Sequence, residues 1–304
     1  MYKVFIDGSA GTTGLRIRER LSERDDIKLI ALPEELRKDL NARKDALNGA
    51  DVVFLCLPDA AAKEAVSVIE NPAVKVIDTS TAHRTAEGWA YGFPEICGYE
   101  SIKNSNRIAN PGCHASGFIA LIAPLVKAGI LSADSRLSCF SLTGYTGGGK
   151  NMIAEYEGDK PELYRAPRAY GLNQSHKHLP EMRAVCGLDF SPVFCPIVAD
   201  FPCGMEVIVP LFPDGLKTSA EELKKLYKSA FDGQIVKYAA DDESGFLSAG
   251  AYAGKDGMGI SVYGNEERIL LVSRFDNLGK GASGAAIENM NILIGEEPTK
   301  GLVL

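Results

Sequence analysis

The chain opens with a predicted strand, a glycine-containing turn and a predicted helix, and this order strongly limits the folds open to it. Residues 3–7 form an apolar run typical of a strand, and residues 15–21 have helical periodicity. Between them, Gly8, Gly11 and Gly14 are spaced Gly-x-x-Gly-x-x-Gly. Such a turn lets the backbone approach a pyrophosphate, which N–H groups at the helix start can bind. An ordinary tight turn is the alternative, but the position directly after the first strand favours nucleotide binding.

Further strands and helices alternate through the first hundred residues. Residues 27–32, 51–58 and 74–78 are predicted strands, and the second of these is apolar enough to be buried on both faces. Asp59 is expected to cap a helix over 60–69. This alternation predicts a parallel, doubly wound sheet whose ligands lie beyond the carboxyl ends of its strands.

From residue 135 the pattern changes to strands of more mixed polarity. They are predicted at 137–142, 193–198, 205–212, 234–238 and 268–273. Ser219 and Glu222 form a capping-box pattern before an amphipathic helix, and residues 283–295 are also predicted to be helical. The second half is therefore expected to be an α+β domain on an antiparallel or mixed sheet.

A cysteine follows a Pro-Gly turn and precedes a run that is apolar on every helical face, at Asn110-Pro111-Gly112-Cys113. A cysteine at a helix N-terminus is favoured as the thiolate, because unpaired N–H groups and the helix dipole stabilise negative charge. The other six cysteines lie in plain apolar contexts. Cys113 is thus a candidate nucleophile, with a buried core thiol as the alternative.

Composition excludes several classes of protein. The net charge of -7 argues against nucleic-acid partners and anionic membrane surfaces. No apolar run approaches the ~20 residues that span a bilayer, and the first residues lack a signal-peptide layout. Seven irregularly spaced cysteines indicate neither a disulfide framework nor a Cys-x-x-Cys metal site. We therefore expect no bound metal and a reducing, cytoplasmic location.

The end of the second predicted strand bears on the choice of dinucleotide. NAD sites usually have an acidic residue there that binds the ribose 2′-hydroxyl, but this strand ends in Leu32-Pro33. Arg37 and Lys38 follow and could face a 2′-phosphate. NADP(H) is therefore the expected cofactor, although the two cations could equally be solvated helix charges.

A series of motifs in this order closely resembles the shorter form of the N-acetyl-gamma-glutamyl-phosphate reductases. The motifs are the turn 8–14, Asp78-Thr79-Ser80 with Arg84, 91–95, 110–113, the glycine-rich loop ending at Lys150, 177–181 and 276–284. The likeness covers nearly the whole chain and extends more widely to aspartate-semialdehyde and glyceraldehyde-phosphate dehydrogenases. It implies a Rossmann-type NADP-binding domain, residues 1–113 with 280–304, into which an α+β catalytic and dimerisation domain, residues 114–279, is inserted. A homodimer or homotetramer is expected.

The resemblance implies reduction of an acyl phosphate through a thioester on Cys113. Histidine suits the proton transfers, and the family pattern centres on His178, with Glu181 orienting its ring or solvating a helix turn. His176 and His114 are the alternatives. Family members often carry Tyr directly after the cysteine, so His114 is a departure from the pattern.

The remaining predicted contacts are with cofactor and substrate. Cofactor contacts are expected from Gly8, Ser9, Ala10, Gly11, Thr12, Thr13, Gly14, Arg37, Lys38, Leu57, Pro58, Ser80 and Asn277. Arg84, Asn110 and Lys150 are expected to bind the anionic substrate. Aspartate-semialdehyde dehydrogenase is the alternative enzyme. A non-catalytic NADP-binding regulator is the alternative of another class, and it would have no use for a reactive Cys113.

Overall fold

The computed structural model describes residues 1–216, 218–240 and 244–304, which form two compact units. The first unit comprises residues 1–111 and 282–302, and the second comprises residues 112–281 and 303–304. Each of the two predicted boundaries is displaced by two residues, so that Cys113 lies in the second unit and not at the end of the first. The last two residues also belong to the second unit.

The first unit is built on a six-stranded sheet in which every pairing is parallel. Its strand order is β2-β1-β3-β4-β6-β5. The strands are β1 (Tyr2–Asp7), β2 (Ile27–Ile30), β3 (Val52–Leu55), β4 (Lys75–Asp78), β5 (Ala90–Tyr91) and β6 (Arg107–Ala109). The predicted doubly wound parallel sheet is confirmed, although the sequence pattern missed the short β5 and β6.

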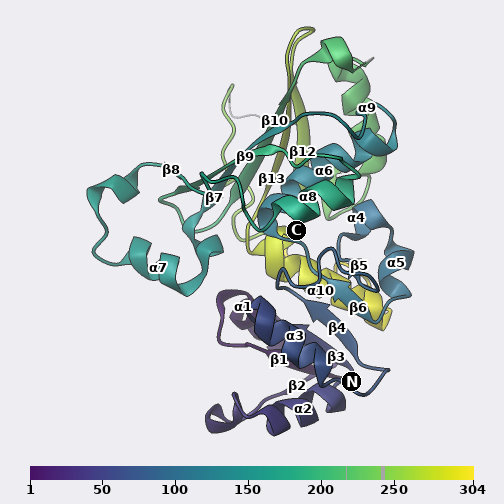
Figure 1. Cartoon of the computed structure of the whole chain (residues 1–304), viewed down its shortest axis with the longest axis vertical. Helices are drawn as coiled ribbons and strands as arrows, with labels where there is room; N and C mark the ends of the chain where they lie inside the picture. Colours follow the sequence, from purple (N-terminus) through teal and green to yellow (C-terminus); the bar gives the residue numbers. More distant parts are fainter. Residues whose placement is uncertain (217, 241–243) are drawn as a thin grey trace. The chain divides into compact units, whose positions relative to one another are not determined.

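Helices cover both faces of this sheet (Figure 1). They are α1 (Thr12–Ser22), α2 (Leu40–Gly49), α3 (Asp59–Ser67), α4 (Pro94–Cys97), α5 (Tyr99–Lys103) and α10 (Gly284–Ile294). One core cluster joins α1, α5 and α10 to the sheet, and the other joins α2 and α3 to its opposite face. A strand covered on both faces must be apolar throughout, as all four residues of β3 are.

The predicted capping role of Asp59 is wrong. α3 begins at Asp59 itself, with Pro58 at the N-cap position. The Asp59 carboxylate instead accepts the backbone N–H of Thr81 at 2.9 Å and also the Thr81 hydroxyl. The side chain therefore ties α3 to the turn after β4, while its charge still lies in the first helical turn, where the dipole favours an anion.

The second unit is built on a seven-stranded mixed sheet of order β11-β12-β13-β10-β7-β9-β8. Its strands are β7 (Ser138–Gly144), β8 (Arg168–Ala169), β9 (Val193–Ala199), β10 (Met205–Leu211), β11 (Val236–Tyr238), β12 (Met258–Gly264) and β13 (Ile269–Phe275). The five predicted strands are present, and the sequence pattern missed β8 and β12. The pairs β7–β9 and β11–β12 are parallel, and the other pairs are antiparallel.

The longest helix of the second unit packs directly on this sheet. The helices are α6 (Cys113–Lys127), α7 (Gly149–Glu157), α8 (Leu179–Cys186) and α9 (Ala220–Ala230), and the predicted capping box begins α9. In α6, a Cβ on Gly117 would lie 2.4 Å from Val207 Cγ2 and 2.7 Å from Ser273 Oγ. The glycine thus permits a close approach of helix to sheet, which holds the start of α6 firmly.

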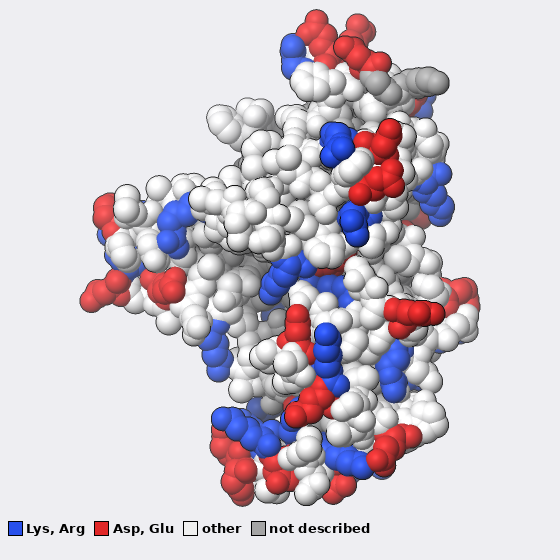
Figure 2. Space-filling view, in the orientation of Figure 1, with Lys and Arg blue, Asp and Glu red and all other residues white. Residues whose placement is uncertain are grey.

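The opposite face of the second sheet carries exposed apolar side chains. Phe140 is 45% exposed, Val193 60% and Leu270 42%. Figure 2 shows uncharged side chains gathered over β7, β9 and β10, while acidic and basic groups are interspersed elsewhere on this view. Within the described ranges, no helix is both long and apolar enough to cross a membrane.

Candidate active site

Cys113 is the first residue of α6, as predicted. Gly112 occupies the N-cap position with extended backbone angles, φ −79° and ψ 146°, and the cysteine itself is half-buried. Gly281 lies against it, because a Cβ on that glycine would be 2.9 Å from Cys113 Cβ. The thiol therefore has both an electropositive helix terminus and a fixed position, which are the conditions for a reactive cysteine.

Glu181 holds the turn before the nucleophile. This residue of α8 is 1% exposed, and its Oε2 accepts the backbone N–H of Gly112 at 3.1 Å. The contact joins the first turn of α8 to the N-terminus of α6. Glu181 thereby positions the cysteine backbone, a role that the sequence pattern missed, and its orientation of His178 stays a prediction.

Three histidines form a cluster that includes His114, the residue after the nucleophile. His178 is 4% exposed at the N-cap of α8, and its ring centroid lies 4.7 Å from that of His176 and 5.6 Å from that of His114. Phe194 of β9 packs against the rings of His114 and His176 at 5.3 Å and 5.1 Å. The residue predicted for proton transfer and its two alternatives thus form one cluster, and one member of it, His114, directly follows Cys113 in the chain.

His114 is hydrogen bonded through both ring nitrogens. Nδ1 lies 2.6 Å from Ser141 Oγ, and Nε2 lies 2.6 Å from the Tyr170 hydroxyl. Burial, together with the charges of His176 and Lys177, lowers the pKa of His114 to about 3. The imidazole is therefore neutral at physiological pH, which makes it poorly suited to donate a proton during turnover.

Tyr170 is a member of this cluster that the sequence pattern missed. Burial raises the pKa of Tyr170, and the negative charge of the Cys113 thiolate raises it further. The phenol therefore stays protonated at neutral pH. Its position directly after the two-residue strand β8 has no periodic signal, so only the fold reveals it.

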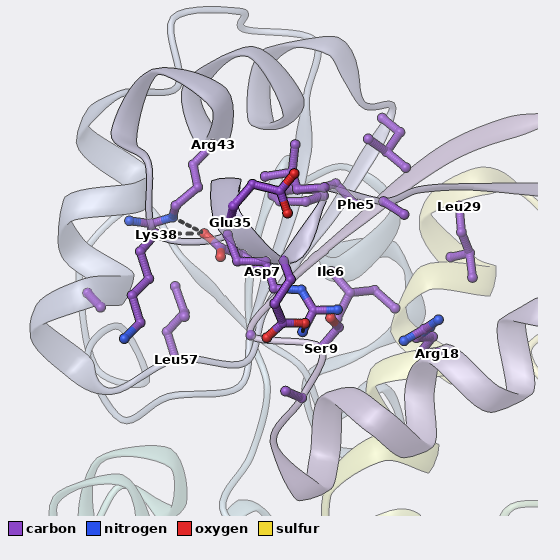
Figure 3. A pocket seen from close by; sticks show the side chains of 18 residues that line it. Phe5, Ile6, Asp7, Ser9, Arg18, Leu29, Glu35, Lys38, Arg43 and Leu57 are labelled. Carbon is purple, nitrogen blue, oxygen red and sulfur yellow. Dashed lines mark hydrogen bonds and ion pairs between the residues drawn. The ribbon is translucent and has the colours of Figure 1, made fainter.

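The glycine turn of the first unit borders a cavity of about 520 Å³ (Figure 3). Gly8 has φ +89°, and a Cβ there would lie 2.3 Å from Cys56 O. A Cβ on Gly14 would lie 2.5 Å from Gly8 O, so both positions require glycine for packing. At Gly11 the nearest heavy atom would be 3.5 Å away. The protein leaves that space open, as close approach of a pyrophosphate requires, so the turn fits a dinucleotide.

Charged side chains border the same cavity. Arg37 and Lys38 line it, their contact with a 2′-phosphate stays a prediction, and Arg37 pairs with Glu34 at 2.8 Å. Figure 3 labels two further cations, Arg18 and Arg43, that the sequence pattern missed. Arg43 donates to Asp7 at 2.9 Å and to Glu64 at 3.1 Å, so its position is fixed by carboxylates. Arg18, Arg37 and Lys38 are the cations here that suit contact with a phosphate.

The other predicted cofactor contacts are dispersed. Ser9, Ala10 and Leu57 line the cavity, Pro58 caps α3, and Thr12 and Thr13 begin α1. Ser80 donates its hydroxyl to Asp78 at 2.8 Å. In the second unit, Asn277 accepts the N–H of Gly204 at 3.0 Å and donates to Thr146 at 2.9 Å. Cofactor contacts by Ser80 and Asn277 stay predictions.

The predicted substrate contacts differ in their surroundings. Arg84 donates to the carbonyls of Asn110 and Thr79 at 3.0 Å and 3.1 Å. Asn110 is buried, donates to Ala282 O at 3.1 Å and accepts from Asn289 at 3.2 Å. Both residues thereby support the segment that leads to Cys113. Lys150 is exposed at the start of α7.

Comparison with known proteins yields matches over nearly the entire chain. A family model described as the NAD-binding domain of semialdehyde dehydrogenase matches residues 3–105, and one described as the dimerisation domain of semialdehyde dehydrogenase matches residues 113–277. Among solved structures, aspartate semialdehyde dehydrogenase II of Vibrio cholerae, complexed with ASA, has a TM-score of 0.73 at 17% identity, covering 97% of this chain and 98% of that one. The enzyme of Candida albicans with NADP has a TM-score of 0.68 at 13% identity, covering 97% and 99%. These two likenesses show the fold.

Relatives in sequence are more specific. N-acetyl-gamma-glutamyl-phosphate reductase of Brucella anthropi is 48% identical, covering 97% of this chain and 99% of the relative. The reductase of Chelativorans sp. is 45% identical, covering 96% and 98%. Together with a parallel nucleotide-binding sheet and a cysteine at the start of α6, these matches show that the chain belongs to the N-acetyl-gamma-glutamyl-phosphate reductase family.

Proposed function

We propose that this protein reduces N-acetyl-gamma-glutamyl phosphate to N-acetylglutamate 5-semialdehyde with NADPH and releases phosphate, a step of arginine biosynthesis. The observation that carries the proposal is the half-buried Cys113 thiol at the start of α6, followed directly by His114, which clusters with His176 and His178. The full-length relatives, which are named for this reaction, supply the substrate class.

Cys113 performs the first chemical step. Its thiolate attacks the acyl carbon, the bond from that carbon to the phosphate oxygen breaks, and a thioester with Cys113 Sγ remains. The N–H groups of the first turn of α6 point toward the charge that develops on the acyl oxygen. The hydrogen bond from Gly112 N–H to Glu181 fixes the turn from which these groups emerge.

The glycine turn and its cations bind the cofactor. The open space at Gly11 receives the pyrophosphate, and Arg18, Arg37 and Lys38 suit the 2′-phosphate of NADP. When bound, NADPH supplies the hydride that converts the thioester carbon to the aldehyde oxidation level. The segment that follows β2 carries Leu32 and Pro33 where an NAD site usually has an acidic residue for the ribose.

His178 carries the proton transfers. It receives the Cys113 thiol proton before attack and returns a proton to the substrate oxygen as the thioester is reduced, leaving that oxygen as a hydroxyl until the thiohemiacetal collapses. An imidazole suits both directions, because its ring nitrogens can accept a proton and donate it again. His114 is excluded from the acid role by its pKa of about 3.

Substrate anions are bound by Arg84, Asn110 and Lys150 in this proposal. Lys150 has an exposed ammonium at the start of α7 that suits a carboxylate. Arg84 and Asn110 support the backbone before Cys113, so their effect on substrate is exerted in part through that segment.

A second copy of the chain covers the open face of the second sheet. The described dimerisation-domain match and the exposed Phe140, Val193 and Leu270 support a homodimer, from which a tetramer could be built. The need for Cys113 to stay in the reduced, thiol form supports a reducing cytoplasm.

The test is the reaction run in reverse. The purified protein is mixed with N-acetylglutamate semialdehyde, NADP and inorganic phosphate, and NADPH formation is followed by absorbance. Reduction of NADP that requires phosphate is expected, with aspartate semialdehyde as the parallel substrate. Faster turnover of aspartate semialdehyde would assign the chain the other specificity, and no turnover of either substrate would overturn the proposal.

A further inference from the structure

A second cavity lies in the second unit, and none of its lining residues is assigned to substrate or cofactor. Its volume is about 240 Å³. The charged and hydrogen-bonding side chains that line it are Gln234, Lys237, Tyr252, Lys255 and Arg274. All three charged side chains are cations, and no acidic side chain of the described residues lines the cavity.

Strand register places two of the cations on either side of a glycine. Lys237 of β11 and Arg274 of β13 are both paired with Gly259, on the strand β12 between them. Side chains at paired positions project from the same face of a sheet, so the two cations flank a position that has no side chain. A Cβ on Gly259 would lie 2.2 Å from the Tyr252 hydroxyl oxygen. Tyr252 thus covers the glycine and brings a hydrogen-bond donor to the position between the cations.

The third cation lies on a loop that is held at both sides. Directly after Lys255, Asp256 donates its backbone N–H to Val303 O at 2.6 Å and accepts the N–H of Val303 at 2.9 Å. Directly before it, Gly254 donates its N–H to the Asp276 carboxylate at 2.5 Å. The backbone at Lys255 is therefore fixed without a ligand, which lowers the entropic cost of binding one.

The charges at this cavity do not balance among the described residues. Glu206 of β10 is paired with Arg274, so one carboxylate stands beside three cations and two positive charges remain. Arg274 is 4% exposed, and a charge buried to that extent needs compensation by groups of opposite charge or by hydrogen bonds. Neither Lys237 nor Lys255 forms an ion pair with any carboxylate of the described chain.

We propose that this cavity binds a small oxyanion with at least two negative charges, carried by phosphate or carboxylate groups. The planar guanidinium of Arg274 suits two oxygens of one such group, and Lys237 and Lys255 supply further positive charge. The volume is roughly eight times the ~30 Å³ that one water occupies in the liquid, so a polyatomic anion fits. The site goes beyond the proposed reaction and does not rest on it.

Isothermal titration calorimetry tests the site on protein saturated with NADP, so that the glycine turn and its cations are already occupied. Pyrophosphate and citrate are titrated in turn, with the ionic strength kept constant by NaCl. Saturable binding of at least one of them is expected, and the tighter of the two distinguishes phosphate from carboxylate chemistry. If neither anion bound saturably, the inference would be overturned.

Substitution of the two exposed lysines locates the binding. In the double variant Lys237→Gln/Lys255→Gln, the Kd should rise about tenfold or more, because two charge-assisted contacts are lost. Lys225→Gln on α9, an exposed lysine outside the cavity, is the matched control and should leave the Kd unchanged. Tyr252→Phe should raise the Kd about threefold. An unchanged Kd in the double variant would overturn the inference, because the anion would then bind elsewhere.

The same variants are examined for oligomeric state and turnover. Arg274 and the exposed Leu270 are four residues apart on β13, so the cavity lies on the sheet face proposed for a second copy. Mass photometry of the double variant should give the oligomer of the parent protein, and its turnover of the semialdehyde should also equal that of the parent. A smaller oligomer would assign the two lysines to the interface and overturn the inference, whereas lack of turnover in the parent would contradict the proposed reaction alone.

Discussion

The two sites of this molecule are built from different parts of the chain. In the first unit, the nucleotide cavity is bordered by a turn in which Gly8 and Gly14 are too crowded for any Cβ and Gly11 is left open. In the second unit, Cys113 is surrounded by packed side chains with specific bonds, such as His114 to Ser141 and Tyr170. Substitutions that add a side chain to the glycine turn should therefore impair the nucleotide site. Substitutions that remove a thiol or an imidazole should impair the site around Cys113.

The sharpest test of the site around Cys113 is the substitution Cys113→Ser. Serine is nearly the same size but is scarcely ionised at neutral pH, so turnover should fall on the order of 10⁴-fold or more, while NADPH binding to the first unit should be unchanged. Steady-state assays and a fluorescence titration with NADPH measure the two effects. Cys195→Ser, another half-buried thiol of the second unit, is the matched control and should retain activity.

His178→Asn is expected to lower turnover by ~10²–10⁴-fold with little change in NADPH affinity, because a general acid/base contributes that much. His176→Asn and His114→Asn serve as comparisons within the same cluster. If either produces the larger loss, the proton-transfer role belongs to that residue.

Two glycine-to-alanine substitutions in the glycine turn form a matched pair. In Gly14→Ala, the methyl group would meet Gly8 O at 2.5 Å, so the free energy of unfolding should fall by about 1–3 kcal/mol. In Gly11→Ala it meets nothing closer than 3.5 Å, so stability should change by less than about 0.5 kcal/mol. The Kd for NADPH should nevertheless rise about tenfold, because the methyl occupies the space of the phosphates. Urea unfolding measures the stability of each variant, and titration with NADPH measures its Kd. Normal NADPH binding by Gly11→Ala would contradict this account.

The buried imidazole of His114 predicts a pH dependence of stability. Its pKa is about 3 in the folded state against 6.5 when exposed, so the unfolded state binds the additional proton as pH falls below 6.5. Stability is therefore intact above pH 6.5 and decreases toward pH 3, by ~2 kcal/mol between pH 6.5 and 5. H114Q has no such group, and its unfolding midpoint should decline less over that interval. The expectation would be refuted if the unfolding midpoints of the parent protein and of H114Q changed with pH to the same extent.

The smallest expected effect concerns the exposed cations of the cavity. Replacing Arg37 and Lys38 together by Ala should raise the Kd for NADPH by roughly threefold to tenfold and leave that for NADH unchanged, since solvent screens such contacts. The loss should diminish at high salt. Arg18→Ala tests the third cation separately, and equal affinity of the parent protein for NADPH and NADH would remove the basis of the cofactor preference.

The difference between the two sites also explains what the sequence could predict. The glycine turn and Cys113 depend on local order along the chain, a strand or turn followed by a helix, and so they were visible without a structure. Tyr170 and Ser141 reach His114 from β8 and β7, and Arg18 reaches the cavity from the exposed side of α1. Such positions depend on which strands become neighbours, and no local pattern carries that information.

Local rules also failed where a longer-range bond competed with them. Asp59 has the sequence context of a helix cap, but the N–H of Thr81 after the next strand is the partner of its carboxylate. β5 and β8 have two residues each, too few to show alternation. Both kinds of error arise because tertiary hydrogen bonds override weak local preferences.

The late position of α10 has a consequence for synthesis of the chain. Ile287 and Met290 complete the same apolar cluster as Val4 and Phe54, although well over two hundred residues separate the two pairs along the chain. A ribosome adding 5–20 residues per second needs roughly 10 to 30 s to pass through residues 112–281 before α10 emerges. During that interval one face of the nascent parallel sheet lacks its final cover, which makes the early chain a natural client for chaperones that bind exposed apolar surface.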